Sequence, residues 1–442
     1  MNKETIKIIG GGLAGCECAY QLLKRGFNVK LYEMRPVTKT PIHKTDSLAE
    51  LVCSNSLKSN DVDTSQGLLK AELRMLDSLL LKCAEKCSVP AGGALAVNRE
   101  DFSRLVEDEL NKFDNLEIIR EEVEDIDLDE YTVIAAGPLC SEKLTKKIME
   151  LTSETELNFY DAVAPIISFK SIDMNKAFFC GRYGKGGDDY LNCPMEKDEF
   201  LKFANELVNA ETVILKDFEN KDIFNACMPI EVMAKKGIDS MRFGPLRPVG
   251  IINPTNNKKY YAVVQLRKED NYNNLYNIVG FQTNLKFKEQ ERVFRLIPGL
   301  ENAEFVRYGV MHKNIFINAP QCINANFRSL KYKKLYFAGQ ISGVEGYMES
   351  TMSGLMCAIN IYRQIIGFES IIPSEETAIG SLVRYISSPK KNFQPMHVSY
   401  ELMPELEEKT RDKKLRKHLY SERAIIKMQE FVNIINNTSS NS

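Results

Sequence analysis

The first 33 residues carry the pattern that most constrains the fold of this chain. An apolar run, TIKII, is followed by the glycine pattern G-x-G-x-x-G, by a stretch with helical spacing and by a second apolar run that ends in Glu33. This order is typical of the strand–turn–helix–strand unit that binds a dinucleotide. The glycines let the backbone approach a pyrophosphate, and the N-terminus of the helix supplies N–H donors to it. Glu33, which follows Gly15 by 18 residues, is placed to accept hydrogen bonds from ribose hydroxyls.

A second segment, residues 335–362, repeats the order of a strand, several glycines and a long helix of small residues. Flavoproteins of the glutathione-reductase type often close their site with such a late segment, whose helix N-terminus faces the flavin, so FAD is the favoured cofactor. The predicted cofactor contacts are Gly10, Gly11, Gly12, Leu13, Ala14, Gly15, Glu33, Arg35, Gly339, Gln340, Gly346 and Tyr347.

Composition excludes several other classes of protein. The 58 basic and 60 acidic residues nearly cancel, so any affinity for nucleic acid must come from a local patch. The chain has no apolar run of about 18 residues and no signal peptide, which predicts a cytoplasmic protein without a membrane span, whose eleven cysteines stay reduced. With no C-x-x-C and only four histidines, neither a metal site nor a disulfide-exchange site is expected.

The order of the segments predicts an α/β fold with an insertion. We expect a Rossmann-like FAD-binding domain of the glutathione-reductase type, an inserted smaller α/β domain, and a helical C-terminal segment. The predicted division is 1–155 for the first part of the FAD domain, 156–310 for the insertion on the substrate side, and 311–442 for the second part and the C-terminus.

A basic run near the C-terminus has helical spacing. Its members are Arg411, Lys413, Lys414, Arg416 and Lys417. Such a run is often only a solvated surface, and the alternative is contact with nucleic-acid phosphates. Within the insertion, Arg242, Arg247 and Arg267 are further candidates for phosphate contact.

The chain also resembles a known family along nearly its whole length. The matching blocks include IIGGGLAGCECAYQL, AELVCSNSLKSN, CMPIEVMAKKG, FGPLRPVG and FAGQISGVEGYMES. They resemble the folate- and FAD-dependent RNA uracil-C5 methyltransferases of the TrmFO type, and more distantly the GidA-type tRNA-modifying enzymes.

This resemblance implies a reaction and two functional thiols. In that family, reduced FAD accepts a methylene group from 5,10-methylenetetrahydrofolate and passes it to C5 of a uridine in the tRNA T-loop, with NADPH or NADH as reductant. The cysteine of CMPIEVMA, here Cys227, is implied as the nucleophile that adds to C6 of the uracil and makes C5 nucleophilic. It precedes a predicted helix, whose N-terminus should lower the pKa of the thiol. The cysteine of ELVCSNSL, here Cys53, is implied as a second functional thiol near the flavin.

Several alternatives stay open at this point. Asn98 stands where the family usually has aspartate, which removes a carboxylate near the cofactor. The stretch from His397 to Pro404 also departs from the family pattern, so the contacts to RNA can differ. The chain is rich in Asn and Lys and lacks Trp, as in AT-rich bacterial genomes, some of which carry a member of this family that methylates rRNA. One alternative is therefore the same chemistry on a uridine of 23S rRNA. Others are a flavin oxidoreductase acting on a small molecule and a non-catalytic flavoprotein that binds RNA. A flipped uracil would need an aromatic or apolar platform, which the sequence does not identify.

Overall fold

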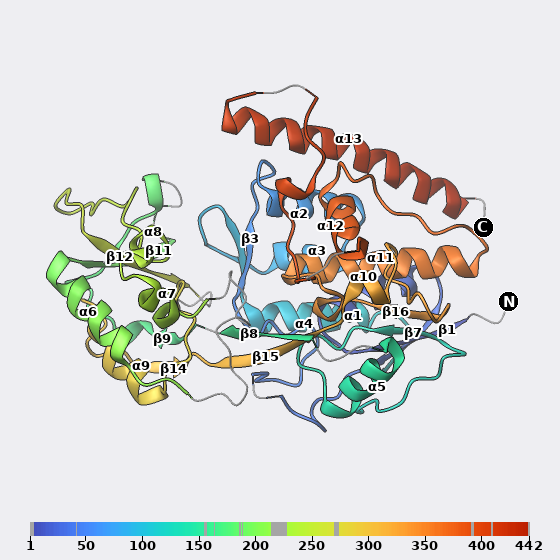
Figure 1. The fold of residues 1–442 in the computed structure, drawn as a ribbon, viewed down its shortest axis with the longest axis horizontal. Helices are drawn as coiled ribbons and strands as arrows, with labels where there is room; N and C mark the ends of the chain where they lie inside the picture. The colour runs from blue at the N-terminus through green and yellow to red at the C-terminus, as the bar shows by residue number, and fades with distance from the viewer. Residues whose placement is uncertain are drawn as a thin grey trace.

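The structure, a computed structural model, falls into two groups of elements, one around a parallel sheet and one around an antiparallel sheet (Figure 1). It describes residues 4–40, 42–153, 157–162, 164–184, 187, 189–213, 228–268, 274–389, 393–407 and 410–440.

The parallel sheet contains the N-terminal pattern and the late segment side by side. Its strand order is β16-β7-β1-β2-β6, and every neighbouring pair is parallel. The strands are β1 (Thr5–Ile9), β2 (Asn28–Tyr32), β6 (Leu116–Ile119), β7 (Tyr131–Ile134) and β16 (Leu335–Phe337). Every residue of β7 and β16 is buried, as expected for parallel strands covered on both faces, whereas burial alternates along β2 and along the first part of β1. The return of the chain to this sheet after residue 310 is what the sequence predicted.

Two helices on this sheet pack unusually closely. They are α1 (Leu13–Lys24) and α11 (Tyr347–Ile365), which start directly after the glycine turn and the late glycines. A Cβ atom on Gly354 of α11 would lie 2.0 Å from the carbonyl oxygen of Ala14 in α1, so only glycine fits there. The N-termini of the two helices are therefore held at the same end of the sheet.

Further elements surround this sheet. They are β3 (Ser56–Ser59), α2 (Ser65–Met75), α3 (Leu79–Lys86), β4 (Ser88–Val89), β5 (Ala94–Val97), α4 (Arg99–Leu110), α5 (Glu142–Thr152), α10 (Ala319–Cys322), η5 (Gln340–Ser342), α12 (Ala378–Ser387), η6 (Tyr400–Leu402) and α13 (Lys413–Ser440). Buried Glu72 of α2 accepts hydrogen bonds from the N–H groups of Ala378 and Ile379 at 2.7 and 2.8 Å, and thereby ties the start of α12 to this unit.

The antiparallel unit has a core of its own. Its strand order is β10-β11-β12-β13-β9-β14. The strands are β9 (Ile166–Ser168), β10 (Phe178–Phe179), β11 (Tyr190–Met195), β12 (Ala262–Lys268), β13 (Leu275–Ile278) and β14 (Phe305–Arg307). Its helices are η1 (Phe169–Ser171), η2 (Arg182–Gly184), α6 (Lys197–Asn209), α7 (Ile230–Lys236), α8 (Ser240–Phe243) and α9 (Phe287–Phe294). Buried Phe200, Phe203, Phe281 and Phe294 dominate a cluster separate from the core of the parallel sheet.

A two-stranded antiparallel ribbon joins the units. It pairs β8 (Leu157–Ala162) with β15 (Met311–Phe316) (Figure 1). The predicted α/β class with a parallel nucleotide-binding sheet is confirmed, whereas the exact division at 155 and 310 remains a proposal. Within the described part of the chain, none of the helices combines the length and apolar character needed to cross a membrane.

Candidate cofactor and active site

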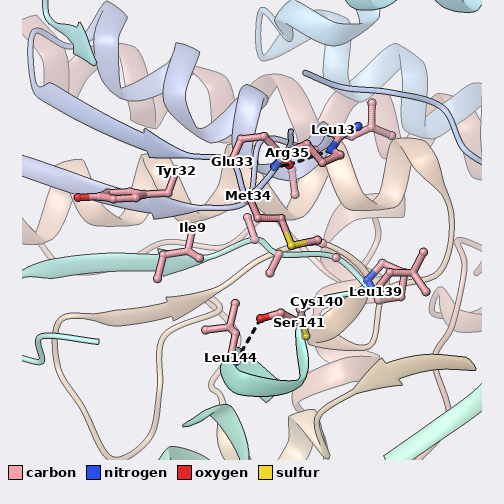
Figure 2. A pocket seen from close by; sticks show the side chains of 18 of the residues that line it. Ile9, Leu13, Tyr32, Glu33, Met34, Arg35, Leu139, Cys140, Ser141 and Leu144 are labelled. Atoms are coloured by element: carbon pink, nitrogen blue, oxygen red, sulfur yellow. Dashed lines mark hydrogen bonds and ion pairs between the residues drawn. The ribbon is translucent and has the colours of Figure 1, made fainter. Parts of the chain in front are cut away.

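A pocket lies at the carboxyl ends of the parallel strands, where open α/β sheets bind their ligands (Figure 2). Its walls come from the residues that follow β1, β2, β7 and β16. The predicted cofactor residues among its lining are Gly10, Gly12, Leu13, Ala14, Glu33, Arg35, Gly339, Gln340 and Tyr347. The structure thus brings together residues from both ends of the chain.

The three motif glycines, Gly10, Gly12 and Gly15, are required for different reasons. Gly10 has φ +112°, and a Cβ there would lie 2.4 Å from the carbonyl oxygen of Ala135. A Cβ on Gly15 would lie 1.9 Å from the carbonyl oxygen of Gly10, so the chain itself requires both glycines. Gly12 is different, because a Cβ there would meet nothing within 4 Å. Its missing side chain leaves open space above the turn, as the approach of a pyrophosphate requires.

Glu33 is held rigidly at the end of β2. Its Oε2 accepts from the N–H of Gly11 at 3.1 Å, and its Oε1 accepts from Nε of Arg35 at 2.8 Å. Burial alone would raise the pKa of Glu33, but the hydrogen bonds and charge of Arg35 hold that pKa below its ordinary value. Arg35 also pairs with Glu50 at 2.8 Å, so the buried guanidinium lies between two carboxylates. An ionised carboxylate oxygen can accept more than one hydrogen bond, so Glu33 can still bind a ribose.

Two helix N-termini at this end of the sheet have no side-chain caps. Gly12 is the N-cap of α1 and Gly346 is the N-cap of α11, and neither helix start receives a side-chain hydrogen bond. The N–H groups of these first turns are donors with partial positive charge. Together with the space above Gly12 and the carboxylate of Glu33, they fit the pyrophosphate, ribose and ring system of FAD.

Three other predicted contacts, Gly11, Gly15 and Gly346, do not line the pocket but shape the backbone next to it. Gly11 donates its N–H to Glu33, Gly15 packs on Gly10, and a Cβ on Gly346 would lie 2.2 Å from a carboxylate oxygen of Glu349. Sequence reasoning missed other lining residues. Among them are His43, Glu50, Val52, Leu139, Cys140 and Ser141. The apolar strand that ends in AAGPL could have indicated Leu139, Cys140 and Ser141, because they follow it directly. Glu50 has no such signal in the sequence, since only folding brings it to Arg35.

Cys53 lies beside the pocket, on the segment 51–55, which we call the thiol loop. The hydroxyl oxygen of Tyr347 accepts hydrogen bonds from the N–H groups of Cys53 at 2.8 Å and of Ser54 at 3.0 Å. Tyr347 also lines the pocket, so one side chain contacts both places. Burial raises the pKa of Tyr347, which keeps its hydroxyl protonated at neutral pH.

Three arginines hold the remaining polar groups of the thiol loop. Arg99, at the start of α4, donates to the carbonyl oxygen of Leu51 at 2.9 Å. Arg307 of β14 donates to the carbonyl oxygen of Val52. Arg267 of β12 donates to Oγ of Ser54 at 2.8 Å and to Oδ1 of Asn55 at 3.1 Å. Because Arg267 and Arg307 belong to the antiparallel sheet, the position of Cys53 depends on both units.

The prediction that Arg267 contacts phosphate is wrong. Its side chain is only 8% exposed, and its guanidinium is committed to the thiol loop. Arg242 lies over the ring of Tyr261, 3.6 Å from the ring centroid, and Arg247 is exposed. Asn98 caps α4 by accepting from the N–H groups of Glu100 and Asp101.

Of the remaining predicted residues, one is not described and five are exposed residues of the C-terminal basic run. Cys227 is outside the described residues, although the predicted helix after it does begin at Ile230 with Pro229 as its N-cap. The basic residues 411, 413, 414, 416 and 417 are exposed, four of them on the first turns of α13. The N-terminal end of α13 is directed toward the antiparallel unit (Figure 1). Among the described residues, no group of His, Cys, Asp and Glu could hold a metal ion.

Comparison with known proteins places these features in context. A family model described as glucose inhibited division protein A matches residues 5–369. The methylenetetrahydrofolate–tRNA-(uracil-5-)-methyltransferase TrmFO of Acetivibrio thermocellus is 52% identical over 97% of this chain and 99% of its own length. The protein of the same name from Bacillus subtilis is also 52% identical, with the same coverage. GidA of Aquifex aeolicus has a TM-score of 0.71 at 14% identity, over 98% of this chain and 74% of its own, which shows a shared fold.

Proposed function

Because the chain belongs to the TrmFO family of methylenetetrahydrofolate–tRNA-(uracil-5-)-methyltransferases, we propose that it methylates C5 of a uridine in tRNA. We place the target uridine in the T-loop. The names of the relatives support tRNA as the substrate and give no support to the alternative of 23S rRNA. The observation that carries the proposal is the position of Cys53, whose N–H is bound by the same tyrosine that lines the nucleotide pocket.

The residues around the pocket suit FAD and would orient it. Bound there, FAD would supply the electrons and the one-carbon chemistry that 5,10-methylenetetrahydrofolate feeds. Glu33 would bind the ribose, and the N–H groups of the first turn of α1 would bind the pyrophosphate. Tyr347 and the three arginines fix the thiol loop, so that the Cys53 thiol is held beside the reacting groups.

Cys227 is the nucleophile in this proposal. Its thiolate adds to C6 of the uracil, which breaks the conjugation of the ring and places negative charge at C5, the atom that receives the one-carbon unit. The two electrons that turn the one-carbon unit into a methyl group would come from the reduced flavin. Loss of the C5 proton and expulsion of the thiolate restore the ring of 5-methyluridine. The match of the block CMPIEVMA to the family supports this role, as does the start of α7 at Ile230, because thiolates are favoured near helix N-termini.

We also propose that NADPH or NADH is the source of electrons. The proposed location is the cytoplasm, where the protein would meet its tRNA and folate substrates.

The proposal is tested by incubating the purified protein with FAD, 5,10-methylenetetrahydrofolate, NADPH and either unmodified tRNA or 23S rRNA fragments. Mass spectrometry then maps any 5-methyluridine. We expect one modified uridine in the tRNA T-loop and none in the rRNA. Methylation of rRNA alone would overturn the target, and FAD reduction by a small substrate without methylation would favour an oxidoreductase. Binding of tRNA without turnover would favour a non-catalytic flavoprotein.

Replacing Arg267 with alanine should slow methylation by about 10- to 100-fold, because two charge-assisted hydrogen bonds to the thiol loop are lost. Single-turnover methylation of tRNA measures this rate, and the flavin absorbance should stay unchanged. Arg295→Ala is the control, since Arg295 also belongs to the antiparallel unit and donates two hydrogen bonds, in its case to the carbonyl oxygen of Ala303, but does not touch the thiol loop. An Arg267→Ala enzyme with the wild-type rate would show that the thiol loop keeps its position without this contact.

The basic start of α13 is proposed as a contact for tRNA phosphates. Alanine at Lys413, Lys414, Arg416 and Lys417 together should weaken tRNA binding and reduce the slope of log K against log salt by up to about 4, because each lysine or arginine lost releases about one counterion fewer. Fluorescence anisotropy at several salt concentrations measures both. Lys427→Ala is the control on the same helix, because Lys427 already pairs with Glu430 at 3.1 Å. An unchanged slope would leave this end of α13 as a solvated surface only.

A further inference from the structure

Tyr183 combines an unusual backbone with an exposed ring. Its φ of +58° and ψ of 30° lie in the left-handed region, which aromatic residues rarely adopt. The side chain is nevertheless 64% exposed, so no burial of the ring compensates for this conformation. Strained residues of this kind cluster at ligand-binding sites, where the surrounding structure holds them in place.

The ring is held against a glycine that has no room for a side chain. The N–H of Tyr183 donates to the carbonyl oxygen of Gly250 at 2.6 Å. Gly250 has φ +83°, and a Cβ there would lie 2.9 Å from Cε1 and Cε2 of the Tyr183 ring. The aromatic ring therefore packs on bare backbone, which supports it as a flat surface facing solvent.

Arg182, the residue before Tyr183, binds the segment that carries Gly250. Its guanidinium donates to the carbonyl oxygens of Arg247 and Val249 and, at 2.9 Å, to Oε1 of Gln265. Burial and the nearby positive charge of Arg247 lower the pKa of Arg182, but the three acceptors hold its planar group in one orientation. The segment 247–250 and the strand β12 are thereby joined under Tyr183.

Strand β12 connects Tyr183 to the thiol loop. Gln265, which binds Arg182, and Arg267, which binds Ser54, are two residues apart on this strand and so project from the same face. Two residues of a strand span about 6.5 Å. Gln265, which binds the residue before Tyr183, and Arg267, which binds the residue after Cys53, are therefore neighbours on one face of the sheet.

Arg247 supplies positive charge beside Tyr183. Its backbone carbonyl accepts from Arg182, and its charge acts on that neighbouring guanidinium. Arg247 is exposed, and among the described residues its side chain has no ion pair or hydrogen bond. An exposed cation next to an exposed ring suits a phosphate beside a nucleobase.

Resting on the proposed function, we propose that Tyr183 is a stacking platform for a nucleobase of the RNA substrate and that Arg247 binds an adjacent phosphate. Unpaired bases of RNA loops are commonly bound by stacking on aromatic rings, with arginine on the backbone. A base that must leave its stack to react needs such a surface near the reacting groups. Tyr183 offers one at the face of β12 that also positions Cys53.

The test compares Tyr183→Gly with Tyr183→Phe by steady-state methylation, varying tRNA and 5,10-methylenetetrahydrofolate separately. Glycine accepts the left-handed backbone and removes the ring, so we expect the KM for tRNA to rise about tenfold or more while the KM for the folate stays the same. Phenylalanine keeps the ring and should restore the wild-type KM. Arg247→Ala should reduce the salt slope of tRNA binding by about 1.

Two outcomes would overturn this inference: an unchanged KM for tRNA in Tyr183→Gly, or a rise in the KM for the folate alone. Phe368→Ala is the control, because Phe368 is also an exposed aromatic residue but lies beyond the far end of α11, about 28 Å of helix away from the pocket. Flavin absorbance and thermal unfolding show that each variant is folded. If the wild-type protein methylates no tRNA, the proposed function fails as well; if it does and the glycine variant keeps its KM, only the platform fails.

Discussion

Alanine in place of Cys227 is expected to lower the rate of tRNA methylation by at least about 10³-fold, while tRNA and FAD still bind. Without the thiolate, C5 of uracil does not become nucleophilic, and no other group in the proposal replaces it. Single-turnover methylation measures the rate, and anisotropy measures tRNA binding. Exchange of the uracil C5 hydrogen with solvent, which also needs addition at C6, should disappear in the same variant.

Cys53→Ala should also abolish methylation, although the cause is different. Cys53 lies beside the nucleotide pocket and is held there by Tyr347. Because addition at C6 is assigned to Cys227, loss of the Cys53 thiol should leave tRNA binding and the C5 exchange intact. Cys180→Ala is the control for both, since Cys180 is half-buried like Cys53 but has no assigned role. Methylation at the wild-type rate in either the Cys53 or the Cys227 variant would remove that thiol from the mechanism.

Gly12→Ala is expected to lower the affinity for FAD at least about tenfold without changing the stability of the protein free of FAD. A Cβ at this position meets nothing within the chain, and its φ of −79° suits alanine. The added methyl group instead fills the space that the pyrophosphate needs. Flavin fluorescence titration measures the affinity, and denaturant unfolding of the protein without FAD measures the stability.

Substitutions at Gly15 and Gly93 serve as controls that separate loss of FAD binding from loss of stability. Gly15→Ala should reduce the free energy of unfolding by about 1–3 kcal/mol or more, because its Cβ would lie 1.9 Å from the carbonyl oxygen of Gly10. Gly93→Ala should change neither quantity, since it too has open space but lies outside the pocket lining. Equal FAD affinity in the Gly12 variant and the wild type would contradict the assignment of this turn to the cofactor.

The nucleotide-binding half of the fold could be predicted because its signal is local. The glycines, the following helix and Glu33 lie within one short stretch, and each has a backbone or ligand reason for its position. The late segment has the same local pattern around Gly339, which predicted that β16 joins the sheet. The mixed insertion was predicted from its strand-like pieces, but its strand order was not, because antiparallel pairing depends on contacts far apart in the sequence.

The surroundings of Cys53 had no local signal. Arg267 and Arg307 are more than 200 residues away from the thiol loop, and only the packing of the two units brings them together. The basic character of Arg267 alone suggested phosphate, whereas burial and hydrogen bonding decide its role. Tyr183 likewise shows its left-handed backbone and its contact with Gly250 only in the folded chain.

The covalent step can be tested most directly with tRNA that contains 5-fluorouridine. Fluorine at C5 cannot leave as a proton does, so the thioether formed at C6 should persist and be detected by mass spectrometry of the digested protein. We predict an RNA adduct on the peptide that contains Cys227, present in Cys180→Ala and absent in Cys227→Ala. The absence of any adduct during turnover, or an adduct that persists in Cys227→Ala, would contradict the mechanism.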